Sequence, residues 1–229
     1  FQYGDKYAHS AIVSSKETIQ SEGPWGVSDK VFNYTVFNSG SLSKYILRKV
    51  PYDFEYADIQ AGIGTPHAVY AEFTADETLL VRAEAQALLG HYAEALNDLN
   101  TELAAFSKDG VQLTLDDVKK FYSDDVTAYY TPEKPTPRKA FHTAFAISKD
   151  TEEPMLQCIL HLRRIMTIHE GLRMQDVKRY GITIYRRDVK SNYKITGITD
   201  TMEARDPRLA IQLPQDVITA GVTPNPRNK

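Results

Sequence analysis

The adjacent residues His169 and Glu170 invite comparison with zinc peptidases. In the HExxH motif of those enzymes, two histidines on one helix bind the metal and the Glu acts as general base. The second His would fall at position 173, where this chain has Arg173. His161 lies eight residues before His169, but no third ligand is apparent, and lone histidines usually have structural roles. We therefore expect no metal site and no cofactor.

Nucleophiles and paired acids form no recognisable catalytic set either. Cys158 is the single cysteine, and no His or Asn arrangement surrounds it in sequence, so we expect a buried apolar side chain. The acidic pair Asp124-Asp125 is interpreted as surface charge. The segment GIGT at 62–65 lacks the later Gly and the Lys of a phosphate loop. We therefore expect a protein that is not an enzyme; the alternative, an enzyme, would require a catalytic cluster that the fold brings together.

Charges of alternating sign recur at every third position of one segment, in the order Glu170, Arg173, Asp176 and Arg179. A Glu at a helix C-terminus opposes the helix dipole, so we expect Glu170 to have a cationic partner. One alternative is an anion site made of Arg163, Arg164, Lys178 and Arg179. Because acids alternate with the bases, we favour a structural ion-pair network. Its expected members are Arg163, Arg164, Glu170, Arg173 and Asp176.

Aromatic residues in loop-like segments are the candidates for ligand binding. Trp25 lies between Pro24 and Gly26, and Tyr129 and Tyr130 lie in a Pro- and Tyr-rich stretch. A pyranose presents C–H groups on one face and hydroxyls at its rim, so a ring bordered by polar side chains suits it. Any one ring taken alone is more often a packing residue. As a group, these three rings are the predicted sugar-contacting residues.

The elements that must position these residues are mainly helical. Between Glu153 and Gly181, apolar residues recur at alternating steps of four and three, which places on one helix face Met155, Ile159, Leu162, Met166 and His169. Gly171 is expected as a left-handed cap. Leu172 to Tyr180 then forms a second helix that folds back on the first. This pair is a helical hairpin.

A second helical hairpin is predicted between Thr74 and Phe106. Thr74 and Glu77 have the spacing of a capping box, and strong helix formers follow as far as Gly90. A small residue, a turn glycine, a ring and another small residue then reproduce tetratricopeptide spacing at Ala83, Gly90, Tyr92, Ala95 and Leu99. One such unit cannot bury its own face, so it must stack on other helical pairs.

The remaining segments read as loops, short hairpins and one short helix. A β-hairpin is expected from Val31–Phe37 and Tyr45–Val50, a long connection over 51–67, and a short helix over 115–122. A small hairpin is expected from 182–186 and 193–196. The fold class is therefore mainly α, with tetratricopeptide-like helical hairpins, long loops and small β-hairpins. Its single region 1–229 divides into a loop-rich 1–73 with a β-hairpin, helical repeats over 74–181 with a loop excursion at 123–150, and a hairpin with a Pro-rich tail over 182–229.

Composition limits the kinds of partner. A length of 229 residues allows one large domain or two small ones. The net charge of −3 argues against bulk nucleic-acid binding, which needs a concentrated basic surface. No window approaches the roughly 18 apolar residues of a membrane span. The first residues lack the basic start and apolar stretch of a signal peptide.

Three segments, in this order and spacing, resemble the SusD/RagB family of outer-membrane nutrient-binding lipoproteins. Residues 77–100 look like the family's AEA, Gly, Ala-Leu and Leu-Asn helical pair. Residues 159–181 resemble its Arg-Arg, Glu-Gly-x-Arg and Asp-x-Lys-Arg pattern, at Arg163, Arg164, Glu170, Gly171, Arg173, Asp176, Lys178, Arg179 and Gly181. Residues 213–227 are similar to its closing segment, at Pro214, Ile218, Asn225 and Pro226.

The resemblance covers the C-terminal part of a family member and lacks the lipobox Cys and first helical repeats, so a fragment or trimmed chain is expected. It implies a non-catalytic protein on the outward face of the outer membrane, anchored only through a lipid absent from this chain. Such a protein captures a glycan or peptide and passes it to a TonB-dependent transporter of the SusC type. The alternative, based on residues 77–100 alone, is a tetratricopeptide-type protein-interaction module.

Overall fold

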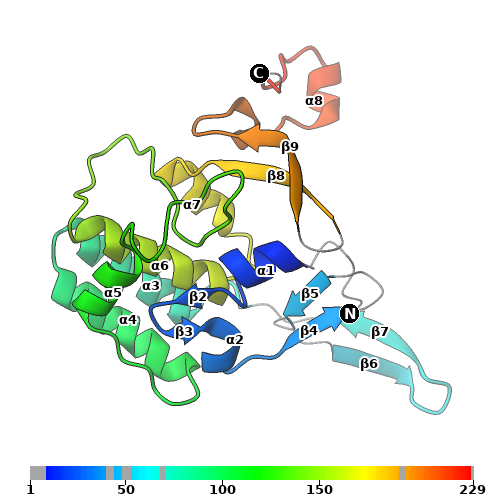
Figure 1. The fold of residues 1–229 in the computed structure, drawn as a ribbon. Coiled ribbons are helices and arrows are strands. Elements are labelled where there is room, and N and C mark those ends of the chain that lie inside the picture. Colours follow the sequence, from blue (N-terminus) through cyan, green and yellow to red (C-terminus); the bar gives the residue numbers. More distant parts are fainter. Residues whose placement is uncertain (1–8, 40–43, 48–52, 68–70, 191–193, 228–229) are drawn as a thin grey trace.

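Five helices form the body of the molecule in the computed structural model, which describes residues 9–39, 44–47, 53–67, 71–190 and 194–227. They are α3 (Ala75–Leu88), α4 (Tyr92–Phe106), α5 (Leu115–Phe121), α6 (Glu152–Met166) and α7 (Arg173–Tyr180). Figure 1 shows them packed together at one side, with most of the strands on the other side. Two short helices, α1 (Ala11–Glu17) and α2 (Ser28–Val31), lie beside this body.

The helical pair α3–α4 confirms the hairpin expected between Thr74 and Phe106. The Thr74 side chain accepts a hydrogen bond from the Glu77 backbone N–H, which begins α3. Gly90 has a φ of 78°, a left-handed conformation that favours glycine, and it ends the turn. Ala83, Ala87 and Ala95 are fully buried, so the small side chains allow close helix packing.

Helix α6 is buried all round rather than on one face. Thirteen of its 15 residues are buried, including polar ones. The apolar stripe Met155, Ile159, Leu162 and Met166 is in the core as expected. The opposite side is also covered, because α3, α4 and α5 all pack against this helix. The polar residues of α6 must therefore be paired inside the protein.

The turn between α6 and α7 contains two left-handed residues. Gly171 has a φ of 81°, as its expected capping role requires, and His169 has a φ of 70°, which only the structure reveals. Gly181 ends α7 with a φ of 59°. A Cβ atom there would lie 2.4 Å from the His142 carbonyl oxygen, so only glycine fits.

The expectation of a mainly α fold is wrong. The described residues are 39% helical and 18% strand, with small antiparallel sheets, which makes a mixed α/β protein. One sheet has the order β1 (His9–Ser10), β5 (Lys44–Leu47) and β4 (Val36–Ser39). Three two-stranded sheets are formed by β2 (Glu22–Gly23) with β3 (Gly26–Val27), β6 (Asp53–Asp58) with β7 (Ile63–His67), and β8 (Ile184–Val189) with β9 (Ile195–Met202).

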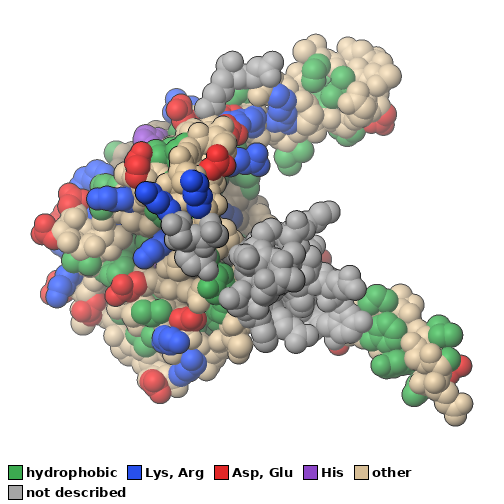
Figure 2. Space-filling model, turned by 45° about the vertical axis from the view of Figure 1, so that its right-hand side comes forward, with side chains coloured by type: hydrophobic (Ala, Val, Ile, Leu, Met, Phe, Trp, Pro, Cys, Tyr) green, Lys and Arg blue, Asp and Glu red, His purple; other side chains and the backbone are tan. Residues whose placement is uncertain are grey.

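Hairpin β6–β7 lies where a long connection was expected. Prolines and glycines indicated a loop, but Pro66 pairs with Phe54 in a two-stranded sheet, where strands keep an unpaired edge that tolerates a missing N–H. Figures 1 and 2 show this hairpin as an arm that projects from the body. Ile59 and Ile63 on it are strongly exposed.

The other expected segments have the following outcomes. Strands β4 and β5 pair as a hairpin, with bounds shifted from those expected, and residues 40–43 between them lie outside the described chain. The β8–β9 hairpin is longer than expected. Helix α5 begins with a complete Thr114–Asp117 capping box. Residues 123–150 carry no helix or strand, as expected of the loop excursion, whereas the loop-rich start also contains α1 and α2.

The main core joins the five helices to the N-terminal segment. Trp25 and Phe32 are buried in the same cluster as Leu99, Tyr122 and Tyr180. The chain ends with a short 3-10 helix η2 (Pro207–Leu209) and helix α8 (Gln215–Thr219), which has no buried residue and projects at the top of Figure 1. Among the described residues, no helix has the length and apolar character needed to cross a membrane.

Candidate functional site

Arg163 is the centre of a buried ion-pair network between α3, α6 and α7. Its guanidinium lies 2.6 Å from Glu84 of α3 and 2.6 Å from Asp176 of α7. Burial alone would lower the pKa of Arg163, but the two carboxylates outweigh it and raise this pKa. Tyr180 donates to the same Glu84 carboxylate at 2.6 Å. The network therefore fixes α7 against the rest of the helical body.

The expected network is brought together only in part. Arg173 lies 3.8 Å from Asp176, so it shares this carboxylate with Arg163. Arg164 faces another way and pairs with Glu17 of α1. Glu170 is half-buried in the turn after α6, where its N–H donates to the Thr167 carbonyl. The carboxylates that the sequence pattern missed are Glu84 and Glu17, because both come from distant segments.

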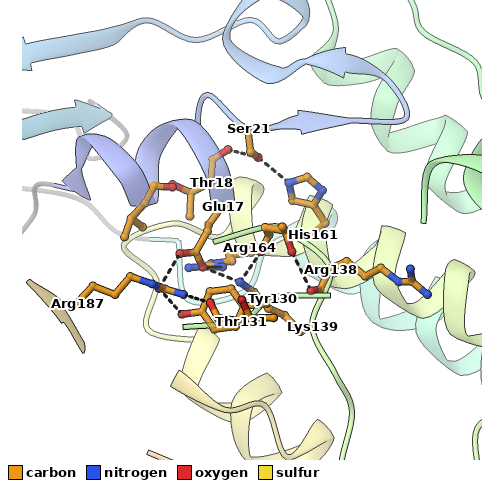
Figure 3. Close-up of polar contacts among 12 residues, drawn as sticks. Glu17, Thr18, Ser21, Tyr130, Thr131, Arg138, Lys139, His161, Arg164 and Arg187 are labelled. Atoms are coloured by element: carbon orange, nitrogen blue, oxygen red, sulfur yellow. Dashed lines mark hydrogen bonds and ion pairs between the residues drawn. The ribbon is translucent and has the colours of Figure 1, made fainter. Parts of the chain in front are cut away.

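Glu17 is the centre of a second buried cluster, drawn in Figure 3. One carboxylate oxygen lies 2.6 Å from the Lys139 ammonium and 3.1 Å from Arg164, and the other lies 3.7 Å from Arg187. These partners come from the loop excursion, α6 and β8. Burial favours the neutral carboxyl, but the cations Lys139 and Arg164 hold the pKa of Glu17 at about 2. Glu17 is therefore an ionised carboxylate that joins four parts of the chain.

Lys139 is buried beside more positive than negative charge. Burial lowers the pKa of this ammonium well below its ordinary range, Glu17 opposes that effect, and Arg164 adds to it. The ammonium lies 3.3 Å from the centroid of the Tyr130 ring and donates to the Thr136 carbonyl at 2.6 Å. The contacts with Tyr130 and Thr136 lie within the loop excursion, and the ion pair with Glu17 joins that loop to α1.

Tyr130 is held in place by this cluster. Arg187 donates to its hydroxyl at 2.8 Å and to the carbonyls of Thr131 and Pro132 at 2.5 and 2.7 Å. On the Tyr130 ring stacks Tyr185 of β8, with 5.3 Å between centroids and 28° between planes. The cluster around Glu17 therefore fixes the position of Tyr185 through one intermediate ring.

Tyr185 lines a cleft of ≈ 820 Å³, which we name the β8–β9 cleft. The volume is within the range of small-molecule sites. Register explains its wall: Tyr185 pairs with Thr201 of β9, so both side chains share one face, and Thr183 lies two residues earlier on that face. The full lining is Ala140, His142, Thr143, Thr183, Tyr185, Thr201, Glu203, Ala204 and Arg205.

Six polar groups of the β8–β9 cleft have no hydrogen-bond or ion-pair partner in the part of the chain that the structure describes. They are the hydroxyls of Thr183, Tyr185 and Thr201, the Glu203 carboxylate, the Arg205 guanidinium and Nε2 of His142. The other ring nitrogen of His142 donates to the Gly181 carbonyl at 3.0 Å, so Nε2 of the neutral ring is an acceptor. The cleft thus combines donors and acceptors.

Arg205 has a strained backbone conformation. Its φ of 64° lies in the left-handed region, which disfavours a residue with a Cβ by about 1–2 kcal/mol. A glycine would avoid this strain in the turn after β9. Strained backbone of this kind often clusters at ligand-binding sites.

The three predicted sugar-contacting rings do not line this cleft. Trp25 is only 5% exposed; its indole N–H donates to the Ser28 hydroxyl at 3.0 Å and its ring lies 4.9 Å from that of His161. As placed, it is a core residue. Tyr129 donates to Glu153 and has the Arg138 guanidinium 3.9 Å from its ring centroid. Tyr130 acts one layer behind the cleft, through Tyr185.

Tyr185 is the aromatic residue that sequence reasoning missed. The alternation of Thr183 and Tyr185 on an expected strand was a usable signal, because such residues share one face. Thr201 and Arg205 had no such signal, since β9 continues beyond the strand expected over 193–196. Their proximity to Tyr185 depends on the register of the hairpin.

Neither a metal site nor a similar known protein indicates the function of this chain. Within the described residues, no group of three His, Cys, Asp or Glu side chains has an arrangement that could hold a metal ion. His161 lies in the core, between the Ser21 hydroxyl at 2.7 Å and the Tyr122 hydroxyl at 3.0 Å. A scan with protein-family models gives no match, and comparisons with curated proteins and with solved structures give no significant one.

Proposed function

We propose that this chain belongs to a non-catalytic cell-surface nutrient-binding protein that holds a glycan or oligosaccharide in the β8–β9 cleft. The observation that carries the proposal is the set of six polar groups without partners that line one cleft backed by a stacked ring. Saccharide hydroxyls both donate and accept hydrogen bonds, so a ligand rich in hydroxyls suits a lining that mixes donors and acceptors.

Arg205 and Glu203 are the residues expected to give most of the affinity. They are two residues apart on one turn and of opposite charge, and they do not pair with each other. Hydrogen bonds to charged groups contribute about 1.5–3 kcal/mol each, more than those between neutral groups. Tyr185 offers an aromatic edge and hydroxyl beside them.

The helical body supports the family assignment on which the cellular part of the proposal rests. Glu84 lies in the first segment that resembles the SusD/RagB family, and Arg163 and Asp176 lie in the second. Their mutual ion pairs join these two segments in one buried unit. By that resemblance, the intact protein faces outward from the outer membrane and delivers its ligand to a TonB-dependent transporter of the SusC type.

Calorimetric titration of the purified chain with a panel of neutral and acidic oligosaccharides tests the binding function. We expect Arg205→Ala to weaken binding of the best saccharide by about tenfold or more, from the loss of a charged hydrogen-bond donor. Arg186→Ala is the matched control. Arg186 is exposed and lies on β8 next to Tyr185, but its side chain points to the opposite face of the hairpin.

Three outcomes count against the proposal. Saccharides that fail to bind the folded chain contradict it, as do equal effects of Arg205→Ala and Arg186→Ala. Binding of unmodified peptides along α3–α4, with no saccharide affinity, favours the alternative of a protein-interaction module. Co-purification from native outer membranes separately tests the transporter partner.

A further inference from the structure

A long trough runs between α1 and the loop residues 126–137, on a part of the molecule separate from the residues of the β8–β9 cleft. It consists of two adjoining hollows of ≈ 590 and ≈ 730 Å³, which we name together the α1 trough. Both hollows are lined by the same four residues at their junction, Ser15, Lys16, Glu133 and Pro135.

The lining changes in character along α1. Most of the lining of the first hollow is apolar, from Ala11, Ile12, Tyr45, Pro135 and Ile195, and the rest comes from Ser15, Lys16, Glu133 and Lys194. Its Ser15 hydroxyl already donates to the Ala11 carbonyl at 2.7 Å. The second hollow adds polar side chains to apolar ones, including Gln20, Thr127, Lys134 and Thr136. A ligand that fits both hollows must have one apolar end and one polar end.

Two lysine side chains line the polar part of the trough. Lys16 lies at the junction and Lys134 in the second hollow, and neither has an ion-pair partner among the residues that the structure describes. The nearest acid in sequence, Glu17, points inward to Lys139 and does not neutralise Lys16. Glu22 and Glu133 also line this hollow, which disfavours ligands with several negative charges.

The walls of the trough are fixed before any ligand arrives. One wall is α1, which ends at Glu17. The other is the loop that contains Thr136, whose carbonyl accepts a hydrogen bond from Lys139. The buried Glu17–Lys139 ion pair joins the two walls below the trough. A preformed apolar site binds without the entropy cost of ordering its walls.

We propose that the α1 trough binds an amphipath with an acyl chain and a single carboxylate, that is, a medium-chain fatty acid. The chain lies in the first hollow, and the carboxylate lies at the start of the second, between Lys16 of the junction and Lys134. An acyl chain needs no hydrogen bonds, which suits a hollow whose one helix hydroxyl is already satisfied, whereas a peptide backbone or a sugar needs many.

The test is calorimetric titration of the full chain with octanoate, decanoate and dodecanoate, each below its micelle concentration, and with decanol and decyltrimethylammonium as head-group controls. We expect affinity to rise about tenfold for every two carbons added. We also expect decanoate to bind at least about tenfold more tightly than decanol, and decyltrimethylammonium to bind more weakly still.

The double substitution Lys16→Gln with Lys134→Gln should abolish the advantage of decanoate over decanol. Lys178→Gln is the control for a charge change, because Lys178 is exposed on α7 and does not line the trough. Equal binding of decanoate and decanol overturns the proposal, as does an equal effect of the trough variant and the control. Arg205 lines the β8–β9 cleft and not the trough, so Arg205→Ala should leave decanoate affinity unchanged. The fatty-acid test is therefore independent of whether saccharides bind.

Discussion

Arg163 of α6 and Glu84 of α3 form a buried ion pair of 2.6 Å, with side chains only 6% and 9% exposed. The pair joins residues 79 positions apart in the chain. Because both charges are out of water, each depends on the other for its stability in the core. Removing one partner therefore costs far more than the pair itself contributes.

We expect Arg163→Met to lower the free energy of unfolding by about 3 kcal/mol, because the buried Glu84 is left with the half-exposed Arg179 at 2.9 Å and the buried Asp176 with Arg173 at 3.8 Å. Urea denaturation measures this. The matched control is Lys119→Met on α5, which also packs against α6; Lys119 pairs at 3.1 Å with Asp150, whose side chain is 80% exposed. Its loss should be much smaller, since water and salt screen an exposed pair. Similar losses in the two variants would show that Arg163 is not effectively buried.

Acid should destabilise the protein through Glu17. Its pKa is about 2 in the folded chain, below its ordinary value of 4.5, because Lys139 and Arg164 favour the carboxylate despite burial. The stability that this difference provides is present above pH about 4.5 and is lost as pH falls toward 2. It amounts to on the order of 3 kcal/mol. Urea denaturation from pH 6 to pH 3 should show a steeper loss for the natural chain than for Glu17→Gln. Parallel curves would contradict the assignment.

His161 predicts a second loss of stability nearer to neutrality. Burial lowers its pKa well below 6.5, and the nearby cations Arg164, Lys139 and Arg173 lower it further. The unfolded chain then binds the proton first, so stability falls as pH drops below about 6.5. We expect His161→Gln to remove this slope between pH 7.5 and 5.5 in thermal unfolding. His91→Gln, at an exposed position, should retain it.

Local signals in the sequence predicted much of the helical body, and long-range pairings were the part that could not be predicted. The Thr74 cap, the turn at Gly90 and the left-handed cap at Gly171 depend on neighbours within a few residues. Glu17 and Lys139 are 122 positions apart, and no spacing rule connects them. The extra strands were missed because edge strands in two-stranded sheets tolerate Pro and Gly that normally indicate loops.

The candidate site shows the same division. Tyr130 was predicted for its ring, but its contacts with Lys139 and Arg187 make it a supporting residue. Tyr185 and Thr201 meet only through the β8–β9 register. Periodicity indicates which residues share a face of one strand, whereas the register across the hairpin decides which residues they meet.

Trp25 should affect folding rather than ligand binding. Its ring packs 5.5 Å from Phe32 and 4.9 Å from His161, and its N–H is bonded to Ser28. Trp25→Ala is therefore expected to cost about 3–5 kcal/mol of unfolding free energy. Saccharide affinity, measured by calorimetry on the fraction that remains folded, should stay within about twofold of the natural value. A large loss of affinity without destabilisation would show that Trp25 contacts the ligand.

Tyr130 should act on the β8–β9 cleft through Tyr185 alone. Tyr130→Phe keeps the ring that stacks 5.3 Å from Tyr185 and removes only the hydroxyl that accepts from Arg187. Tyr130→Ala removes the stack, which is worth about 0.5–1.5 kcal/mol beyond buried area. We expect the Ala variant to weaken saccharide binding by about threefold to tenfold and the Phe variant to change it little.

A readout without ligand separates this positioning role from general stability. In NMR spectra, the Tyr185 ring protons should shift in Tyr130→Ala, because the neighbouring ring no longer lies over them, and should stay near their natural positions in Tyr130→Phe. Tyr129→Ala is the control, since Tyr129 contacts Arg138 and Glu153 instead. If both alanine variants shifted Tyr185 equally, its position would depend on the loop as a whole and not on the stacked ring.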